Sequence, residues 1–362
     1  MTTHPVIHAR QEHRLPDSLG VMSPAPRAVW EAVIASDPNA LVSQTPAWID
    51  FVCSAGGYED ASRLYELPGG RRLVLPMVRR RHVPALLAID SSLPPAWGTG
   101  GILAPGGITF ADVAAVFSDL AGGSVLRTSL RPNPLDAEAW SAARPPDAVI
   151  VPRRSHVLDL EGGFARVWQE RFKSVARTAV RKAERSGLVV ERDTTGRLVP
   201  VLYDLFERSL PRWADKQHEP HLMARLRGHR RDPRRKFELM AQMLGEACRI
   251  WVAWSGGRPA AAILILQAGN ANYTRGMMDK EVAGPTRANY LLHRLAIEDA
   301  CAAGCRYYHM GESGSSASLA QFKTRFGARP VPYAEYHLER VPITAIDTGT
   351  RGVVKRIIGF RD

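Results

Sequence analysis

One lysine of this chain lies between two phenylalanines, and its residue type is rare in the sequence. Lys323 occurs in the stretch SLAQFKTRFGARPVPY, next to Phe322 and three residues before Phe326, in a chain with 41 arginines and 7 lysines. An ammonium is a compact charge that suits a single developing negative oxygen, whereas the planar guanidinium of arginine suits two-point contact with phosphate. Lys323 is therefore a candidate for stabilising such an oxygen. The alternative is an ordinary lysine on a helix surface.

A second set of basic side chains recurs at steps of four residues: Lys173, Arg177, Arg181 and Arg185. On a helix predicted over residues 164–186 they would form one stripe, because a step of four residues drifts only about 40° per turn. Val175 would then face the protein. The stripe indicates either a phosphate-bearing partner or a solvated helix face.

The positive charge of the chain is concentrated in its second half. Residues 1–150 carry 12 basic and 14 acidic residues (−2), and residues 151–362 carry 36 basic and 22 acidic residues (+14), which together give the net charge of +12. The run RLRGHRRDPRRK contributes Arg234 and Arg235; such runs are typical of mobile, solvated segments and support backbone phosphate contact at most. The excess predicts a polyanionic or phosphorylated partner. The alternative is an arginine-rich protein from a GC-rich genome.

Several other kinds of site have no support in the sequence. The HExxH, Walker A, G-x-G-x-x-G and G-x-S-x-G motifs are absent, and the spacing of the four cysteines fits neither a zinc site nor a disulfide framework. We therefore expect no metal and a reduced, cytoplasmic setting. There is no apolar run of transmembrane length. Residues 1–20 lack the apolar core of a secretory signal and are expected to form a flexible leader, and residues 341–362 a basic tail.

The elements that must position these side chains follow from hydrophobic periodicity and turn residues. The length predicts two domains, over residues 21–150 and 151–340, with a proline-rich passage between them. In the second half we expect a helix, a strand, a helix broken at Pro211, three antiparallel strands with a hairpin at Gly256-Gly257, and then helix, strand, helix, strand. The mixture indicates an α/β fold with mixed sheets.

The first half shows clear local signals as well. Thr45-Pro46 predicts a helix start, because threonine is a good N-cap and proline is tolerated in the first turn. The segment ASRLYELPGGRRLVLPMVRRR predicts two strands around a Pro-Gly-Gly turn. The Gly/Pro-rich loop PPAWGTGGILAPGG contains Trp97.

Three segments together resemble the double-domain, Fem-like branch of the GNAT acyltransferase superfamily: VARTAVRKAERSGLVVERD, GPTRANYLLHRLAIEDACAAGCRYYHMGE and LAQFKTRFGARPV. Weaker matches at QTPAWIDFV, LVLPMVRRR and WGTGGILA extend the resemblance over most of residues 40–340. It implies two GNAT-like units in tandem, each a mixed sheet flanked by helices. Some members of this branch transfer an amino acid from aminoacyl-tRNA to an amine on a peptide precursor, and others are thought to use acyl-CoA.

The resemblance also implies a role for Lys323, because the lysine of the FK pair lies at the transfer centre of Fem-type enzymes. An amine that attacks an ester or thioester carbonyl builds a negative oxygen there. A fixed ammonium would stabilise it by ~3 kcal/mol, the scale of one oxyanion donor. Phe322 and Phe326 would help to exclude water.

The attacking amine must lose a proton, and two carboxylates follow strands near the expected sheet centre. We rank Glu312 first and Asp279 second as the proton acceptor. Tyr273 and Arg275 alternate along their strand and could reach the donor from one face.

The loop that cradles CoA pyrophosphate in GNAT enzymes is altered in the stretch KEVAGPTRANY. Gly284, Thr286 and Arg287 are present, but Pro285 removes one backbone amide. This weakens the case for acyl-CoA and favours a donor carried on tRNA. The alternative for the loop is an ordinary helix start capped by Thr286.

These patterns predict an N-acyltransferase that joins an aminoacyl group from aminoacyl-tRNA to an amine-bearing small molecule, peptide or peptidoglycan precursor, with no permanently bound cofactor. Two other functions stay open: an acetyl-CoA-dependent N-acetyltransferase on the same fold, and a non-catalytic protein that binds anionic polymers. A polymer binder needs the basic stripe but has no use for Lys323. A CoA enzyme needs the intact loop. The sequence does not predict the oligomeric state.

Overall fold

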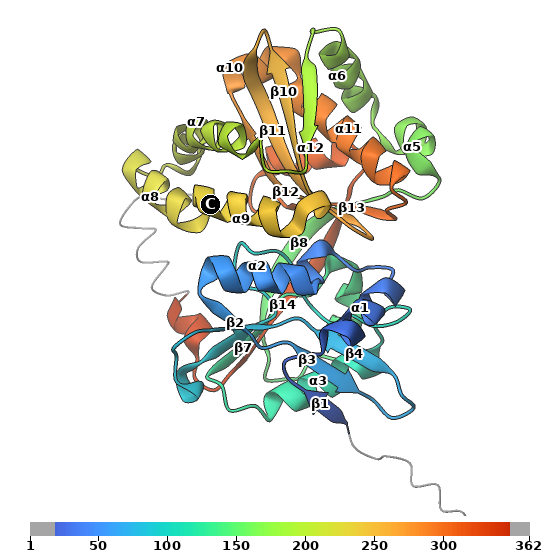
Figure 1. The fold of residues 1–362 in the computed structure, drawn as a ribbon, viewed down its shortest axis with the longest axis vertical. Coiled ribbons are helices and arrows are strands. Elements are labelled where there is room, and N and C mark those ends of the chain that lie inside the picture. Colours follow the sequence, from blue (N-terminus) through green and yellow to red (C-terminus); the bar gives the residue numbers. More distant parts are fainter. Residues whose placement is uncertain (1–18, 348–362) are drawn as a thin grey trace, which may run out of the picture.

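A computed structural model describes residues 19–347, so that nearly all of the predicted leader and most of the predicted basic tail lie outside the described residues. Within these residues one mixed sheet runs through both halves of the chain (Figure 1). This confirms the predicted α/β class. The strands of that sheet, in spatial order, are β2 (Tyr58–Asp60), β5 (Val78–Arg80), β6 (Ile89–Ser91), β7 (Arg127–Leu130), β14 (Arg329–Glu339), β8 (Val149–Asp159), β13 (Tyr307–Glu312), β12 (Ala271–Met278), β11 (Arg258–Gln267), β10 (Cys248–Ser255) and β9 (Val189–Asp193).

The first half adds four helices and a small second sheet within the described residues: α1 (Arg27–Ser36), α2 (Pro46–Gly56), α3 (Phe110–Ala121), α4 (Ala137–Ala142), and strands β1 (Gly20–Met22), β3 (Arg63–Glu66) and β4 (Arg72–Leu75). Thr45 caps α2 as predicted, because its Oγ1 accepts the Trp48 amide at 3.2 Å. The predicted pair of strands around the Pro-Gly-Gly turn is the β3–β4 hairpin. The second of these strands stops at Pro76, and the chain continues as β5 in the large sheet.

The described helices of the second half are α5 (Gly163–Arg166), a π-helical turn (Val167–Arg171), α6 (Ser174–Glu184), α7 (Val199–Gln217), α8 (His221–Arg231), α9 (Arg234–Leu244), α10 (Lys280–Thr286), α11 (Ala288–Ala302) and α12 (Ala317–Arg325). They differ from the prediction in three places. The single helix over 164–186 is wrong, because the chain breaks at Phe172 and Lys173. Pro211 lies inside a continuous α7. The basic run read as a mobile segment forms α8 and the start of α9. No described helix is long and apolar enough to cross a membrane.

The two halves share a strand pair and a core. The long strands β8 and β14 pair with each other over nine residues and link the halves at the middle of the sheet (Figure 1). A hydrophobic cluster combines Trp30 and Phe51 from the first half with Phe206, Phe237 and Leu264 from the second. Because this burial is common to both halves, the space between them has fixed walls.

The sheet opens between β12 and β13, which are parallel neighbours. They pair only at Ala271–Tyr308 and Asn272–His309. The register of β13 against β8 then shifts between His309 and Gly311, and Gly311 has a φ of 70°. The strands therefore separate toward their carboxyl ends, and α12 follows β13 at this opening. The meander β10–β11–β12 and its hairpin at Gly256-Gly257 are as predicted.

Gly327 fixes the exit from α12, and we predict that Gly327→Ala destabilises the protein by about 3 kcal/mol. Its φ is 86°, and an added Cβ would lie 2.5 Å from the backbone oxygen of Arg171. Gly304→Ala is the matched control, since Gly304 has a φ of 77° with nothing near the added Cβ, and should cost about 1 kcal/mol. Urea unfolding measures both, and equal losses would contradict the importance of the contact.

Candidate active site

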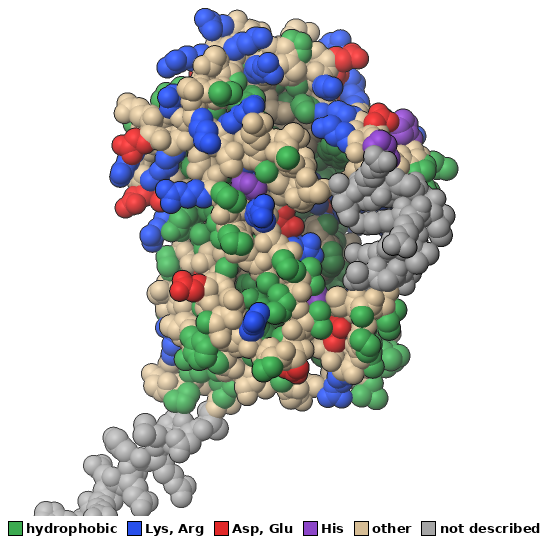
Figure 2. Space-filling view, turned by 180° about the vertical axis from the view of Figure 1, so that it is seen from behind, with side chains coloured by type: hydrophobic (Ala, Val, Ile, Leu, Met, Phe, Trp, Pro, Cys, Tyr) green, Lys and Arg blue, Asp and Glu red, His purple; other side chains and the backbone are tan. Residues whose placement is uncertain are grey.

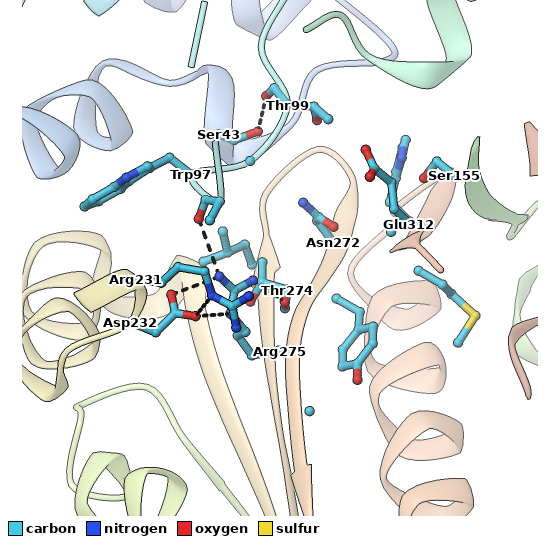
Figure 3. A pocket seen from close by; sticks show the side chains of 18 of the residues that line it. Ser43, Trp97, Thr99, Ser155, Arg231, Asp232, Asn272, Thr274, Arg275 and Glu312 are labelled. Atoms are coloured by element: carbon cyan, nitrogen blue, oxygen red, sulfur yellow. Dashed lines mark hydrogen bonds and ion pairs between the residues drawn. The ribbon is translucent and has the colours of Figure 1, made fainter. Parts of the chain in front are cut away.

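A cavity of about 580 Å³ lies between the two halves, over the opening of the sheet. The first half contributes Ser43, Trp97 and Thr99, which lie across the cavity from Asn272 and the other β12 residues (Figure 3). Ser43 Oγ donates to the Thr99 carbonyl at 2.6 Å and holds the loop that carries Trp97. The remaining wall includes residues of α7, α8, α9, β13 and α12, together with Arg131, Ser155 of β8 and Tyr333 of β14.

Lys323 lies in this cavity wall and is 1% exposed. Its Nζ donates to the carbonyl oxygens of Gly311 at 2.9 Å and Glu312 at 2.7 Å. An ammonium has three N–H groups, so a third is left for a ligand. Burial lowers the pKa of Lys323 to about 8, and the Glu312 charge opposes the shift. The alternative of an ordinary surface lysine is wrong.

Glu312 presents its side chain to the same cavity. Its carboxylate accepts a hydrogen bond from the Tyr333 hydroxyl, and Arg131 Nη2 lies 3.6 Å from Oε1. Burial, followed by the charge of Glu312, raises the pKa of Tyr333 well above its usual value. The hydroxyl therefore stays protonated and keeps donating. Glu312 thus holds the lysine through its backbone carbonyl and presents its carboxylate to the same cavity.

His309 and Tyr273 also line the cavity. The His309 ring is buried, and its Nε2 has no hydrogen-bond partner among the described residues. Burial lowers the pKa of His309 to about 4, so the ring is neutral near pH 7. The Tyr273 ring packs edge-on against His293, with ring centroids 4.6 Å apart. Tyr273 and Arg275 both line the cavity, but a β-bulge in the pairing of β12 with β11 lies between them. Tyr273 therefore lies on the face of the sheet that α11 covers, and Arg275 lies on the opposite face, against Asp232. The prediction that the two side chains share one face is wrong.

Asp232 organises the wall opposite Lys323, and sequence reasoning missed it. Its buried carboxylate accepts from Arg275 Nη2 at 2.9 Å, Lys236 Nζ at 3.0 Å and Arg231 Nε at 2.8 Å (Figure 3). Burial opposes ionisation of Asp232, but the charges of Arg275 and Lys236 outweigh it and hold the pKa well below the usual value. Arg275 is therefore bound to the protein as well as facing the cavity.

The loop of the first half closes over this cluster. Lys236 Nζ lies 4.0 Å from the Trp97 ring centroid, a cation–π contact, and 3.3 Å from the Ala96 carbonyl. Burial lowers the pKa of Lys236 to about 8. A signal was present in the sequence: Asp232 is the one acid in the basic run, and Lys236 is one of only seven lysines.

Several predicted site residues lie outside the cavity. Asp279 caps α10, accepts the Glu281 amide at 3.1 Å and lies 3.4 Å from Arg208 Nη1 and 3.5 Å from Arg258 Nη2. It does not line the cavity wall, because it follows the far end of β12. The expectation that Asp279 lies near Lys323 at the sheet centre therefore has no support in the geometry.

The predicted donor loop is helical. Gly284 and Thr286 lie in α10, where Thr286 Oγ1 donates to the Val282 carbonyl at 2.7 Å, and Arg287 has a φ of 59° at the junction with α11. Because α10 uses amides for its own hydrogen bonds, it offers a poorer pyrophosphate cradle than an open loop. Phe322 packs in an aromatic cluster behind the lysine, with Tyr290, His293 and Phe326.

The basic stripe is divided by the break before α6. Val175, which was predicted to face the protein, is 53% exposed, whereas Ala176 and Val180 are buried. The buried face of α6 therefore begins one residue later in the sequence than predicted. Lys173, Arg181 and Arg185 are exposed. Arg177 Nη1 instead donates to the carbonyl oxygens that end the preceding helical segment, those of Trp168, Gln169 and Phe172.

Arginine and lysine side chains gather over the second half in space as well as in sequence, in the upper part of Figure 2. Arg234 and Arg235 are exposed at the start of α9, and Arg234 Nε donates to Glu238 at 2.8 Å. No group of His, Cys, Asp and Glu side chains in the described part of the chain is arranged to hold a metal ion.

We predict that Asp232→Asn destabilises the fold by about 3–5 kcal/mol, because it leaves three cations without their buried anion. Asp204→Asn is the matched control. Asp204 forms an exposed ion pair with Arg208 at 3.0 Å, and its loss should cost less than about 1 kcal/mol. Denaturant unfolding of both variants at neutral pH measures the difference. A loss for Asp232→Asn as small as the control's would contradict an anchoring role.

Comparison with known proteins adds independent findings. Residues 170–324 match a family model described as an acetyltransferase (GNAT) domain. The chain is similar to the crystal structure of FemX, with a TM-score of 0.63 and 12% identity over 88% of this chain and 96% of that one. It is also similar to a conserved protein of unknown function from Bacteroides thetaiotaomicron, with a TM-score of 0.54 and 9% identity over 86% and 97% of the two chains. No curated protein matches the sequence.

At these identities the structural similarity shows a shared fold, and the resemblance to double-domain GNAT proteins is confirmed at that level. The domain match supports an acyltransferase activity. It spans the chain from α6 to most of α12, including Lys323 and Glu312. The chain therefore has the fold of FemX, and its residues 170–324 match the model of a GNAT acetyltransferase domain.

Proposed function

We propose that this protein is an N-acyltransferase that transfers an aminoacyl group from aminoacyl-tRNA to an amine acceptor. The observation that carries the proposal is the buried Lys323 ammonium. Two carbonyls fix it in a cavity that the Glu312 carboxylate also lines. A fixed charge beside a proton acceptor is the arrangement that attack of an amine on a carbonyl requires.

The reaction follows from these two groups. The acceptor amine attacks the ester carbonyl of the donor, a C–N bond forms, and the carbonyl oxygen becomes negative next to Lys323 Nζ. Glu312 takes the proton that the amine must lose. When the intermediate collapses, the C–O bond to the ribose breaks, and the leaving oxygen needs a proton. Because its pKa is lowered to about 8, Lys323 can donate that proton more readily than an ordinary lysine.

The structure of α10 supports a tRNA-borne donor over acyl-CoA. Its helix replaces an open glycine-rich loop, and Pro285 contributes no amide. The exposed cations Lys173 and Arg181, in a half of the chain with a net charge of +14, provide contacts for a nucleic-acid backbone. A cytoplasmic location, where charged tRNA is present, belongs to the same proposal.

The cavity itself favours an acceptor that carries an anionic group. Six cations line it against two carboxylates, Asp232 and Glu312, an excess of four positive charges. The six cations are Arg131, Arg227, Arg231, Lys236, Arg275 and Lys323. A peptide carboxylate or a sugar phosphate on the amine-bearing molecule would offset this charge.

An acetyl-CoA-dependent N-acetyltransferase is the second candidate, favoured by the match to the acetyltransferase domain. The test is a donor-discharge assay with the full chain, a panel of amines, and either charged tRNA or acetyl-CoA. We expect amide product and deacylated tRNA, with acetyl-CoA unchanged and CoA bound weakly in calorimetric titration. Discharge of acetyl-CoA alone would establish the second candidate. Salt-dependent tRNA binding without discharge of either donor would favour a polymer binder.

We predict that Lys323→Met lowers single-turnover transfer on the order of a hundredfold, the usual effect of losing one oxyanion donor. Methionine keeps most of the buried volume, so the melting temperature should change far less than the rate. Lys323→Arg keeps the charge but not the geometry and should stay slow. Lys280→Met, at an exposed lysine of α10, should transfer at the wild-type rate. A wild-type rate in Lys323→Met would remove Lys323 from the mechanism.

The pH profile gives a second readout of the same assignment. The ammonium is the active form, so the Lys323-dependent rate should be present below about pH 8 and be lost as the pH rises through the lowered pKa. The loss should approach tenfold per pH unit well above that pKa. Lys323→Met should show no alkaline fall at this position.

A further inference from the structure

The orientation of α8 is fixed by two small residues. Ala224 and Gly228 are buried one turn apart and face α7. The approach is close, because a Cβ added to Gly228 would lie 2.8 Å from Leu210 Cδ2. The opposite face of α8 therefore points away from the protein, and Figure 1 shows the helix at the left edge of the molecule.

That outward face carries large apolar side chains. Leu222, Met223 and Leu226 are 70%, 41% and 64% exposed, and they lie together because positions i, i+1 and i+4 share one side of a helix. The helix contains no acidic residue. Arg225 and Arg230 lie beside the apolar face and are exposed, with Arg225 Nη2 3.8 Å from Glu207. The other basic residues of the helix pair with carboxylates of the protein: His221 with Asp215, Arg227 with Glu219, His229 with Glu207 and Arg231 with Asp232.

We propose that α8 docks this face onto the surface of a bilayer that contains anionic phospholipids. The three apolar side chains enter the boundary between headgroups and acyl chains, and the flanking arginines contact lipid phosphates. A basic amphipathic helix of this kind lies in the membrane plane and does not span it, which agrees with the absence of a described membrane-spanning helix.

Charge and polarity favour a bilayer over other occupants of the face. The chain segment 348–362 holds four basic residues and one acid, so it would meet the arginines of α8 with like charge. A second copy of α8 would do the same. RNA would satisfy the arginines but leave three apolar side chains in water. An anionic bilayer matches both kinds of side chain.

The docking surface adjoins the proposed active site without overlapping its chemistry. Arg227 and Arg231 lie on the cavity side of α8, and Arg227 Nε donates to Glu219 at 3.0 Å. A bilayer at the outer face would therefore lie beside one wall of the cavity. The proposal does not depend on the acyl-transfer reaction, because it concerns side chains that do not line the cavity.

The test is sedimentation of the full chain with vesicles of phosphatidylcholine alone, or mixed with phosphatidylglycerol. We expect binding to the mixed vesicles that weakens with added salt. The double variant Leu222→Ser/Leu226→Ser should lose on the order of tenfold in partitioning. Arg225→Gln/Arg230→Gln should lose the preference for the anionic lipid. The matched control is Val175→Ser/Val189→Ser, at positions 53% and 67% exposed elsewhere on the second half, and it should bind as wild type.

Equal melting temperatures for the variants establish that each is folded. The proposal is overturned if wild type stays in the supernatant with the mixed vesicles. It is also overturned if Leu222→Ser/Leu226→Ser binds these vesicles as well as the control Val175→Ser/Val189→Ser does. It is also overturned if Leu222→Ser/Leu226→Ser lowers the mass in sedimentation velocity while vesicle binding persists, since the face would then be an interface between copies. Loss of RNA binding in that variant, with vesicle binding unchanged, would assign the face to RNA.

Discussion

The burial of one ammonium constrains the centre of the molecule. A charged amine away from water is costly unless its N–H groups find acceptors, and Lys323 finds them in the carbonyls of Gly311 and Glu312. Those carbonyls lie just beyond His309, where β13 stops pairing with β12 and Gly311 takes its left-handed conformation. The opening of the sheet, the left-handed Gly311 and the position of α12 therefore together supply the acceptors that a buried ammonium needs.

The opposite wall meets a different electrostatic requirement. Around Asp232, one buried anion is shared by three cations, and the loop with Trp97 closes over Lys236 from the first half. Because β8 and β14 and a common core join the halves, this loop is held rigidly against the second half. The cavity is consequently positive and preformed, and its charge is set by residues whose own positions depend on one another.

Local patterns predicted the elements whose signals lie within a few residues. The Thr45 cap, the hairpin at Gly256-Gly257 and the three-stranded meander are of this kind. The helices α8 and α9 were not predicted, because the high charge of the basic run is typical of a solvated segment. The folding of α8 depends instead on the packing of Ala224 and Gly228 against α7. The burial of Lys323 and the ion pairs of Asp232 are long-range contacts, which no local pattern contains. The rarity of lysine in the chain and the family resemblance indicated Lys323, but neither predicted which carbonyls would hold it.

The positive charge of the second half is divided between the surface and the cavity. Lys173, Arg181 and Arg185 are exposed, whereas Arg177 is bound to backbone carbonyls. Arg231, Lys236 and Arg275 surround Asp232. An excess of four positive charges faces a cavity of about 580 Å³, too confined for a nucleic-acid duplex but large enough for a small anionic substrate. Holding cations at the edge of a cavity is costly, and this cost is most readily understood if a small anionic molecule is bound there beside Lys323.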